Sequence, residues 1–147
     1  MPSVSLDINI NASVDRVWDA VLDIERYSDS MANVRWVKVL ERDGATLRRS
    51  AWSIVLKGSI LEWQEEDRLD PEAHTVRFHQ LSGDLAEFDG EWSLEELEPG
   101  LTRVTFDVSF EIGIPLLAEM LNPVAQRSLR ENCKEMLAGV EREALAA

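Results

Sequence analysis

Two acidic residues, Glu65 and Asp67, are the side chains of this sequence best placed for acid–base chemistry. They lie in the stretch LEWQEEDRLD and share the period-two phase of Leu61 and Trp63. If that phase faces a core, burial raises the pKa of both carboxyl groups and suits them to proton transfer. The alternative is that the stretch runs into a solvated turn, where both carboxylates are exposed.

Three further polar residues have a chemical and a structural interpretation each. Gln80 could hydrogen-bond a ligand carbonyl, or it could satisfy a neighbouring backbone group. Tyr27 could place its hydroxyl at the mouth of a cavity, or it could be a surface tyrosine. Cys133, the only cysteine, lies on an apolar helix face, which disfavours a nucleophilic thiolate. With two histidines besides, the chain is not expected to hold a metal, and no cofactor is expected.

Composition narrows the class of protein. The chain has 147 residues, of which 45% are hydrophobic and 29% charged, as expected of a single globular domain over residues 1–147. The formal net charge of −13, without a basic cluster, argues against a nucleic-acid partner. No apolar run is long enough for stable membrane insertion. The start, MPSVSLDINI, lacks the features of a secretory signal, so we expect a cytoplasmic protein; its oligomeric state stays open.

Hydrophobic periodicity predicts an α+β fold that could position these residues. Residues 3–11 alternate as a strand, Ser13 can cap a following helix, and residues 25–33 form a second short helix or a turn. Six more strands are predicted at 34–41, 46–56, 59–69, 74–81, 84–97 and 101–112, joined by Gly-, Asp- or Pro-containing turns. A long helical region reaches from Pro115 to about Ala144. The prediction is a curved antiparallel sheet of about seven strands wrapped on a long C-terminal helix.

Three stretches of the chain together resemble a known superfamily. They are INASVDRVWDAVLDIERYSD, HTVRFHQLSGDLAEFDGEWSL and TRVTFDVSFEI. In order and spacing they resemble the START-like helix-grip (SRPBCC) superfamily, specifically the bacterial polyketide cyclase/dehydrase group. The resemblance implies that the space between sheet and long helix holds a small hydrophobic ligand. The aromatase branch of this family places arginines in the cavity, but the matching positions here are Asp67 and Gln80. Arg68 could take that role only if a bulge re-phased its strand.

Residue phases indicate which side chains would line such a cavity. On residues 84–97 the inward set includes Phe88, Gly90 and Trp92, and Gly90 marks either a bend or room for a ligand between two rings. A valine at position 90 is expected to fit if the room is real. The complete set of predicted ligand-binding residues is Tyr27, Trp52, Ile54, Trp63, Phe78, Gln80, Phe88, Gly90, Trp92, Phe106, Phe110, Leu117, Met120 and Leu121.

Three functions are compatible with this sequence. The first is binding of an aromatic, polyketide-like or isoprenoid ligand, with cyclisation or dehydration promoted by Glu65 or Asp67. The second is a non-catalytic carrier of a lipid or quinone, which needs an apolar cavity and no acid–base group. The third is a protein-interaction module resembling the ribosome-associated toxins of the superfamily.

Overall fold

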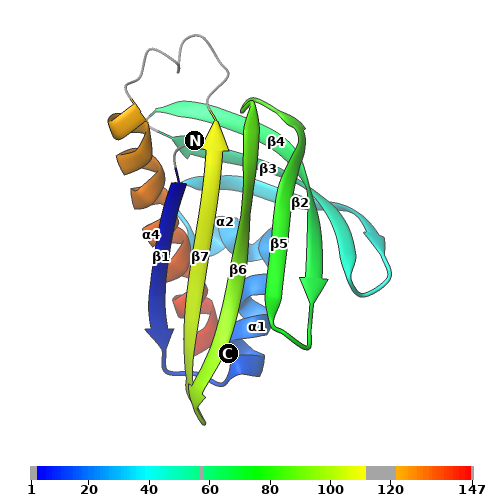
Figure 1. Ribbon diagram of the computed structural model, residues 1–147, viewed down its shortest axis with the longest axis vertical. Coiled ribbons are helices and arrows are strands. Elements are labelled where there is room, and N and C mark those ends of the chain that lie inside the picture. Colours follow the sequence, from blue (N-terminus) through cyan, green and yellow to red (C-terminus); the bar gives the residue numbers. More distant parts are fainter. Residues whose placement is uncertain (1–2, 57, 112–121, 147) are drawn as a thin grey trace.

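Seven antiparallel strands form a single curved sheet in the computed structural model (Figure 1). The structure describes residues 3–56, 58–111 and 122–146. The strand order across the sheet is β1-β7-β6-β5-β4-β3-β2, so every strand from β2 to β7 pairs with its neighbour in sequence. The strands are β1 (Ser3–Ile10), β2 (Val34–Asp43), β3 (Leu47–Leu56), β4 (Ser59–Asp70), β5 (Thr75–Gly83), β6 (Glu87–Glu98) and β7 (Leu101–Glu111).

The helices lie on the concave side of this sheet (Figure 1). Helix α1 (Val14–Leu22) follows β1, and Ser13 caps it by accepting a hydrogen bond from the backbone N–H of Arg16. A 3₁₀ turn, η1 (Ile24–Arg26), leads directly into the short helix α2 (Tyr27–Ser30). The long helix α4 (Asn122–Ala146) packs against β1, α1 and α2. The predicted α+β architecture is therefore confirmed, including the short helix pair after the first strand.

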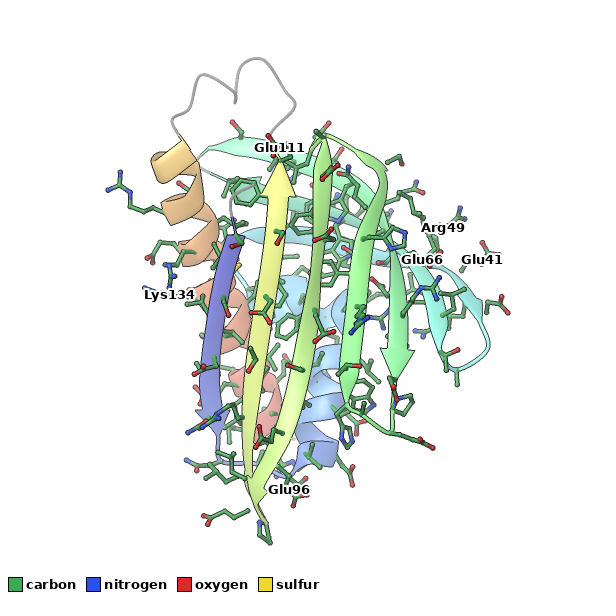
Figure 2. All side chains as sticks on the ribbon, in the orientation of Figure 1. Glu41, Arg49, Glu66, Glu96, Glu111 and Lys134 are labelled. Atoms are coloured by element: carbon green, nitrogen blue, oxygen red, sulfur yellow. The ribbon has the colours of Figure 1, made fainter. Side chains whose placement is uncertain are left out.

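Strict alternation along the strands places the core between the sheet and the helices. In β7, residues Val104, Phe106, Val108 and Phe110 are buried, while the residues between them are more exposed. Helix α4 contributes the buried side chains of Leu129, Cys133, Leu137, Val140 and Ala144 to the same core. The opposite face of the sheet carries charged residues, among them Glu41, Arg49 and Glu66 (Figure 2).

Within the described residues, no helix is both long enough and apolar enough to span a membrane.

Candidate functional site: an aromatic cavity between the sheet and helix α4

A cavity of about 40 Å³ lies between the inner face of strands β3–β7 and helix α4. Almost all of its wall is apolar. The described residues that line it are Trp52, Ile54, Trp63, Glu65, Phe78, Phe88, Trp92, Phe106, Val108, Leu129, Asn132, Cys133 and Met136. Seven of these, Trp52, Ile54, Trp63, Phe78, Phe88, Trp92 and Phe106, are predicted ligand-binding residues that the structure brings together.

Two stacked indole rings form one wall of the cavity. Trp52 of β3 and Trp63 of β4 are direct cross-strand partners, and their ring centroids lie 5.9 Å apart at an angle of 4°. The indole N–H of Trp52 donates to Ser50 Oγ at 2.9 Å, and that of Trp63 donates to Glu65 Oε1 at 2.8 Å. Each ring is thus fixed by a residue two positions along its own strand, so the wall is pre-organised.

Phenylalanine and tryptophan rings from the next three strands continue this wall. Trp92 of β6 lies 4.1 Å from Phe106 of β7, measured between ring centroids. Phe78 of β5 contacts both Phe106 and Phe88, at centroid distances of 5.9 and 5.5 Å. Phe88 also contacts Trp63 at 5.0 Å, which joins the phenylalanines to the indole pair. The cavity is consequently shaped by flat aromatic faces.

Both predicted acidic residues point inward and are buried, at 4% exposure for Glu65 and 1% for Asp67. The alternative of a solvated turn is therefore wrong, because β4 continues with unbroken alternation to Asp70. Burial raises the pKa of Glu65 well above its ordinary range, and a hydrogen bond and repulsion from Asp67 raise it further. Trp63 and Arg48 act in the opposite direction, but burial dominates. Of the two acids, only Glu65 lines the cavity.

Arg48 is a buried member of this cluster that the sequence analysis did not single out. Its Nε forms an ion pair with Asp67 Oδ2 at 2.8 Å, and its Nη1 donates to the Leu22 carbonyl at 2.8 Å. Its inward orientation could have been predicted from the sequence, because Arg48 shares the period-two phase of Ser50 and Trp52 on β3. Arg68 lies on the outer face with a side chain 69% exposed, so it does not provide the cavity with a cation.

Tyr27 lies neither at a cavity mouth nor at the protein surface, the two positions expected for it. It is 1% exposed, and its hydroxyl donates to the Val21 carbonyl at 2.6 Å, at the end of helix α1. Its ring meets Trp52 edge-on at a centroid distance of 5.7 Å, behind the cavity wall. Burial raises the pKa of this hydroxyl, which remains protonated. Tyr27 thus supports Trp52 and does not reach a cavity mouth.

The space expected beside Gly90, between Phe88 and Trp92, is occupied by the Phe78 ring. Gly90 pairs with Phe78 across β5 and β6, and an added Cβ would lie 2.5 Å from Cζ of that ring. It would lie closer still to the backbone oxygen of Asp107 on β7. The expectation that a valine fits at this position is therefore wrong. Gly90 is the site of close approach that lets Phe78 lie flat over the sheet.

The remaining predicted residues divide into two groups. Gln80 donates from Nε2 to the Leu85 carbonyl at 2.7 Å, as the backbone alternative expected, and does not line the cavity. Phe110 is buried at 2% exposure but lies outside the cavity wall. Leu117, Met120 and Leu121 fall outside the described residues.

Helix α4 closes the cavity with residues that were not predicted to bind a ligand. Leu129, Cys133 and Met136 follow the helical period and project from one face of α4. Burial raises the pKa of Cys133 to about 12, so it remains a neutral thiol. Asn132 donates from Nδ2 to the Val55 carbonyl at 3.0 Å, which ties α4 to β3 at the cavity edge. No group of three His, Cys, Asp or Glu that could hold a metal occurs in the part of the chain described.

Comparison with known proteins places this architecture in a family. The family model described as polyketide cyclase/dehydrase and lipid transport matches residues 10–137. The chain belongs to this family. Two Streptomyces proteins provisionally named polyketide cyclases are similar in sequence. The S. halstedii protein is 29% identical over 65% of this chain and 89% of its own length. The S. cyaneus protein is 26% identical over 88% of this chain and 92% of its own length.

Several solved structures have the same fold as this chain. A Thermus thermophilus protein superposes with a TM-score of 0.91 at 31% identity, covering 99% of this chain and 98% of its own. The Zhui aromatase/cyclase of Streptomyces sp. R1128 superposes with a TM-score of 0.84 at 21% identity, covering 97% and 93%. A START superfamily protein of Mycobacterium smegmatis gives a TM-score of 0.81 at 18% identity over the whole of both chains. The START-like, helix-grip assignment is thereby confirmed.

Proposed function

We propose that this protein binds a small, flat, uncharged hydrophobic molecule in the cavity between the sheet and helix α4. The observation that carries the proposal is the wall itself, in which, among the described residues, rings from five strands surround a single carboxyl group. Burial raises the pKa of that carboxyl, Glu65, well above its ordinary range, which favours its neutral form. A wall without net charge favours an apolar ligand over an ionic one.

The size of the cavity indicates how such a ligand enters. About 40 Å³ accommodates roughly three water molecules, whereas sites for drug-sized ligands measure roughly 300–1,000 Å³. The indole wall is fixed by its hydrogen bonds, so the added volume comes from the α4 side. Met136 on α4 is only half-buried and has a flexible thioether side chain that can change rotamer. Binding therefore displaces the α4 wall and leaves the aromatic wall in place.

Cyclisation or dehydration of a polyketone is a second candidate function, favoured by the position of Glu65. A protonated carboxyl in an apolar cavity can donate to a ligand carbonyl or to a departing hydroxyl once its O–H turns from Asp67 toward the ligand. The cavity would also fold a flexible chain so that its reacting carbons meet. A carrier needs neither effect, so the Glu65→Gln variant distinguishes a carrier from a catalyst. In either case the variant should still bind the ligand, but if the protein is a catalyst the variant should also lose its turnover.

Two measurements test the proposed binding. Native mass spectrometry of gently purified protein would detect a retained hydrophobic molecule. Fluorescence titration with the neutral probe N-phenyl-1-naphthylamine would then measure binding in wild type, Cys133→Leu and Lys134→Leu. Leucine at 133 fills the cavity and should weaken binding about tenfold or more, whereas Lys134 is exposed on α4 and serves as the control. Equal affinity in all three proteins would contradict a site in this cavity.

A further inference from the structure

The two oxygens of the Asp67 carboxyl group have very different surroundings. Oδ2 accepts hydrogen bonds from Arg48 Nε at 2.8 Å and from Ser50 Oγ at 2.9 Å. Oδ1 is fully buried, and no N–H or hydroxyl group of the described residues donates a hydrogen bond to it. Burying a carboxylate oxygen without a hydrogen-bond donor is unfavourable, so a donor is needed at Oδ1.

Glu65 is in position to supply that donor. It lies two residues before Asp67 on the same face of β4, and a hydrogen bond between the two carboxyl groups is one of the causes that raise the pKa of Glu65. Two ionised carboxylates repel each other and cannot share a hydrogen bond, so the contact requires one proton between them. The other Glu65 oxygen, Oε1, already accepts from the Trp63 indole. A protonated Glu65 can therefore satisfy Asp67 Oδ1 while it holds Trp63 in place.

The charge balance of the cluster supports the same arrangement. Arg48, 3% exposed, is its cation, and Asp67 is the anion paired with it. Among the described residues, the other titratable groups near Glu65 are Tyr27 from α2 and Cys133 from α4 across the cavity, and burial keeps both neutral. One proton on Glu65 leaves the buried cluster without net charge, whereas its loss would leave an uncompensated anion.

We propose that Asp67 is a positioning residue: anchored by Arg48 and Ser50 through Oδ2, it accepts at Oδ1 a hydrogen bond from the protonated Glu65 carboxyl. This contact keeps Glu65 neutral and fixes its orientation in the cavity. Asp67 thus acts through Glu65 and does not itself touch the ligand, so of the two acids only Glu65 would act on it directly. The inference deepens the proposed function, because it explains how the wall of the ligand cavity stays uncharged.

The indole N–H of Trp63 provides a direct readout of Glu65. It donates to Glu65 Oε1, so its ¹H and ¹⁵N NMR shifts change when that carboxyl ionises. In wild type the Trp63 signal should show no transition near pH 4.5, the ordinary pKa of a glutamate carboxyl group, because the Glu65 pKa is raised above it. Asp67→Asn removes the repulsion and leaves the Arg48 cation facing Glu65, so the Glu65 midpoint should fall by about 1–3 pH units. Glu65→Gln, which cannot titrate, identifies the transition.

Two variants keep this test decisive. Glu66→Gln removes one negative charge from the outer face of the same strand and should leave the Trp63 profile unchanged. If Asp67→Asn alone does not fold, Arg48→Gln/Asp67→Asn removes both buried charges and should still lower the midpoint. A wild-type Trp63 signal that titrates near pH 4.5, or the same midpoint with and without Asp67, would overturn the proposal. N-phenyl-1-naphthylamine titrations of the same proteins test the ligand site separately. Lack of probe binding would contradict that site, whereas the role of Asp67 would still be decided by the Trp63 signal.

Discussion

Glu65 and Glu66 are adjacent in the chain and identical in type, yet they belong to different chemical environments. Glu65 points into the core beside Trp63 and Asp67, where burial raises the pKa of its carboxyl group well above its ordinary range. Glu66 points away from the core, where it forms an ion pair with Arg68 at 3.2 Å (Figure 2). The same contrast holds for the arginines, since Arg48 is 3% exposed and Arg68 is 69% exposed. Strand phase, more than residue type, decides which charges can take part in chemistry.

The sharpest way to test this contrast is to break one ion pair on each face. Arg48→Met leaves Asp67 buried without its cation and the Leu22 carbonyl without its donor. We expect a loss of about 3–5 kcal/mol in the free energy of unfolding, measured by urea denaturation. Arg68→Met removes the exposed pair and should cost no more than about 1 kcal/mol. Similar losses in both variants would show that the inner pair is not energetically distinct.

Much of this contrast could be predicted from the sequence, because period-two alternation is a local property. The strands and the inward phase of Glu65 and Asp67 both follow from it. Arg48 was missed although it shares the phase of Trp52, because two adjacent arginines, Arg48 and Arg49, are typical of a solvated strand end. Its burial depends on Asp67 from the neighbouring strand and on the Leu22 carbonyl, which only the tertiary structure brings close.

Gly90 and Tyr27 show a second limit of local reasoning. The phase of Gly90 between Phe88 and Trp92 does not reveal that Phe78, the cross-strand partner, fills the gap. That knowledge requires the register of β5 against β6. For Tyr27, a short segment between helix and strand has no periodicity from which burial could be predicted. Its position depends on where the η1 turn directs α2 against Trp52.

The Gly90→Ala substitution tests whether the sheet can accommodate a methyl group at position 90, where Phe78 and the Asp107 backbone lie close to the Gly90 backbone. The new methyl group would collide with the Phe78 ring and with the backbone oxygen of Asp107, so strands must shift. We expect a loss of about 1–3 kcal/mol in the free energy of unfolding. Asp89→Ala, whose side chain points to the outer face, is the control and should change stability by less than about 0.5 kcal/mol. A neutral effect of Gly90→Ala would mean that the sheet yields at this position.

The pH dependence of stability sharpens the comparison of the two glutamates. Below about pH 4.5, the ordinary pKa of Glu65, both folded and unfolded states hold its proton and its contribution is fully present. As the pH rises above that value the unfolded state ionises first, so stability falls by about 1.4 kcal/mol per pH unit until the raised folded-state pKa is reached.

Glu65→Gln should remove this slope, because its amide can donate to Asp67 and accept from Trp63 as the protonated acid does. Its stability advantage over wild type should therefore grow with pH above 4.5, measured by urea denaturation across a pH series. Glu66→Gln should retain the wild-type slope. A Glu65→Gln curve parallel to that of wild type would indicate that Glu65 is ionised in the folded protein.

Two probes of nearly equal shape test the central claim most directly. N-phenyl-1-naphthylamine is neutral, and 8-anilinonaphthalene-1-sulfonate adds a sulfonate to the same ring skeleton. Their affinities should be compared by fluorescence titration in 0.5 M NaCl, where screening reduces the effect of the −13 net charge. An uncharged aromatic cavity predicts one bound molecule per chain and at least about tenfold tighter binding of the neutral probe. Equal or tighter binding of the sulfonate would contradict this account.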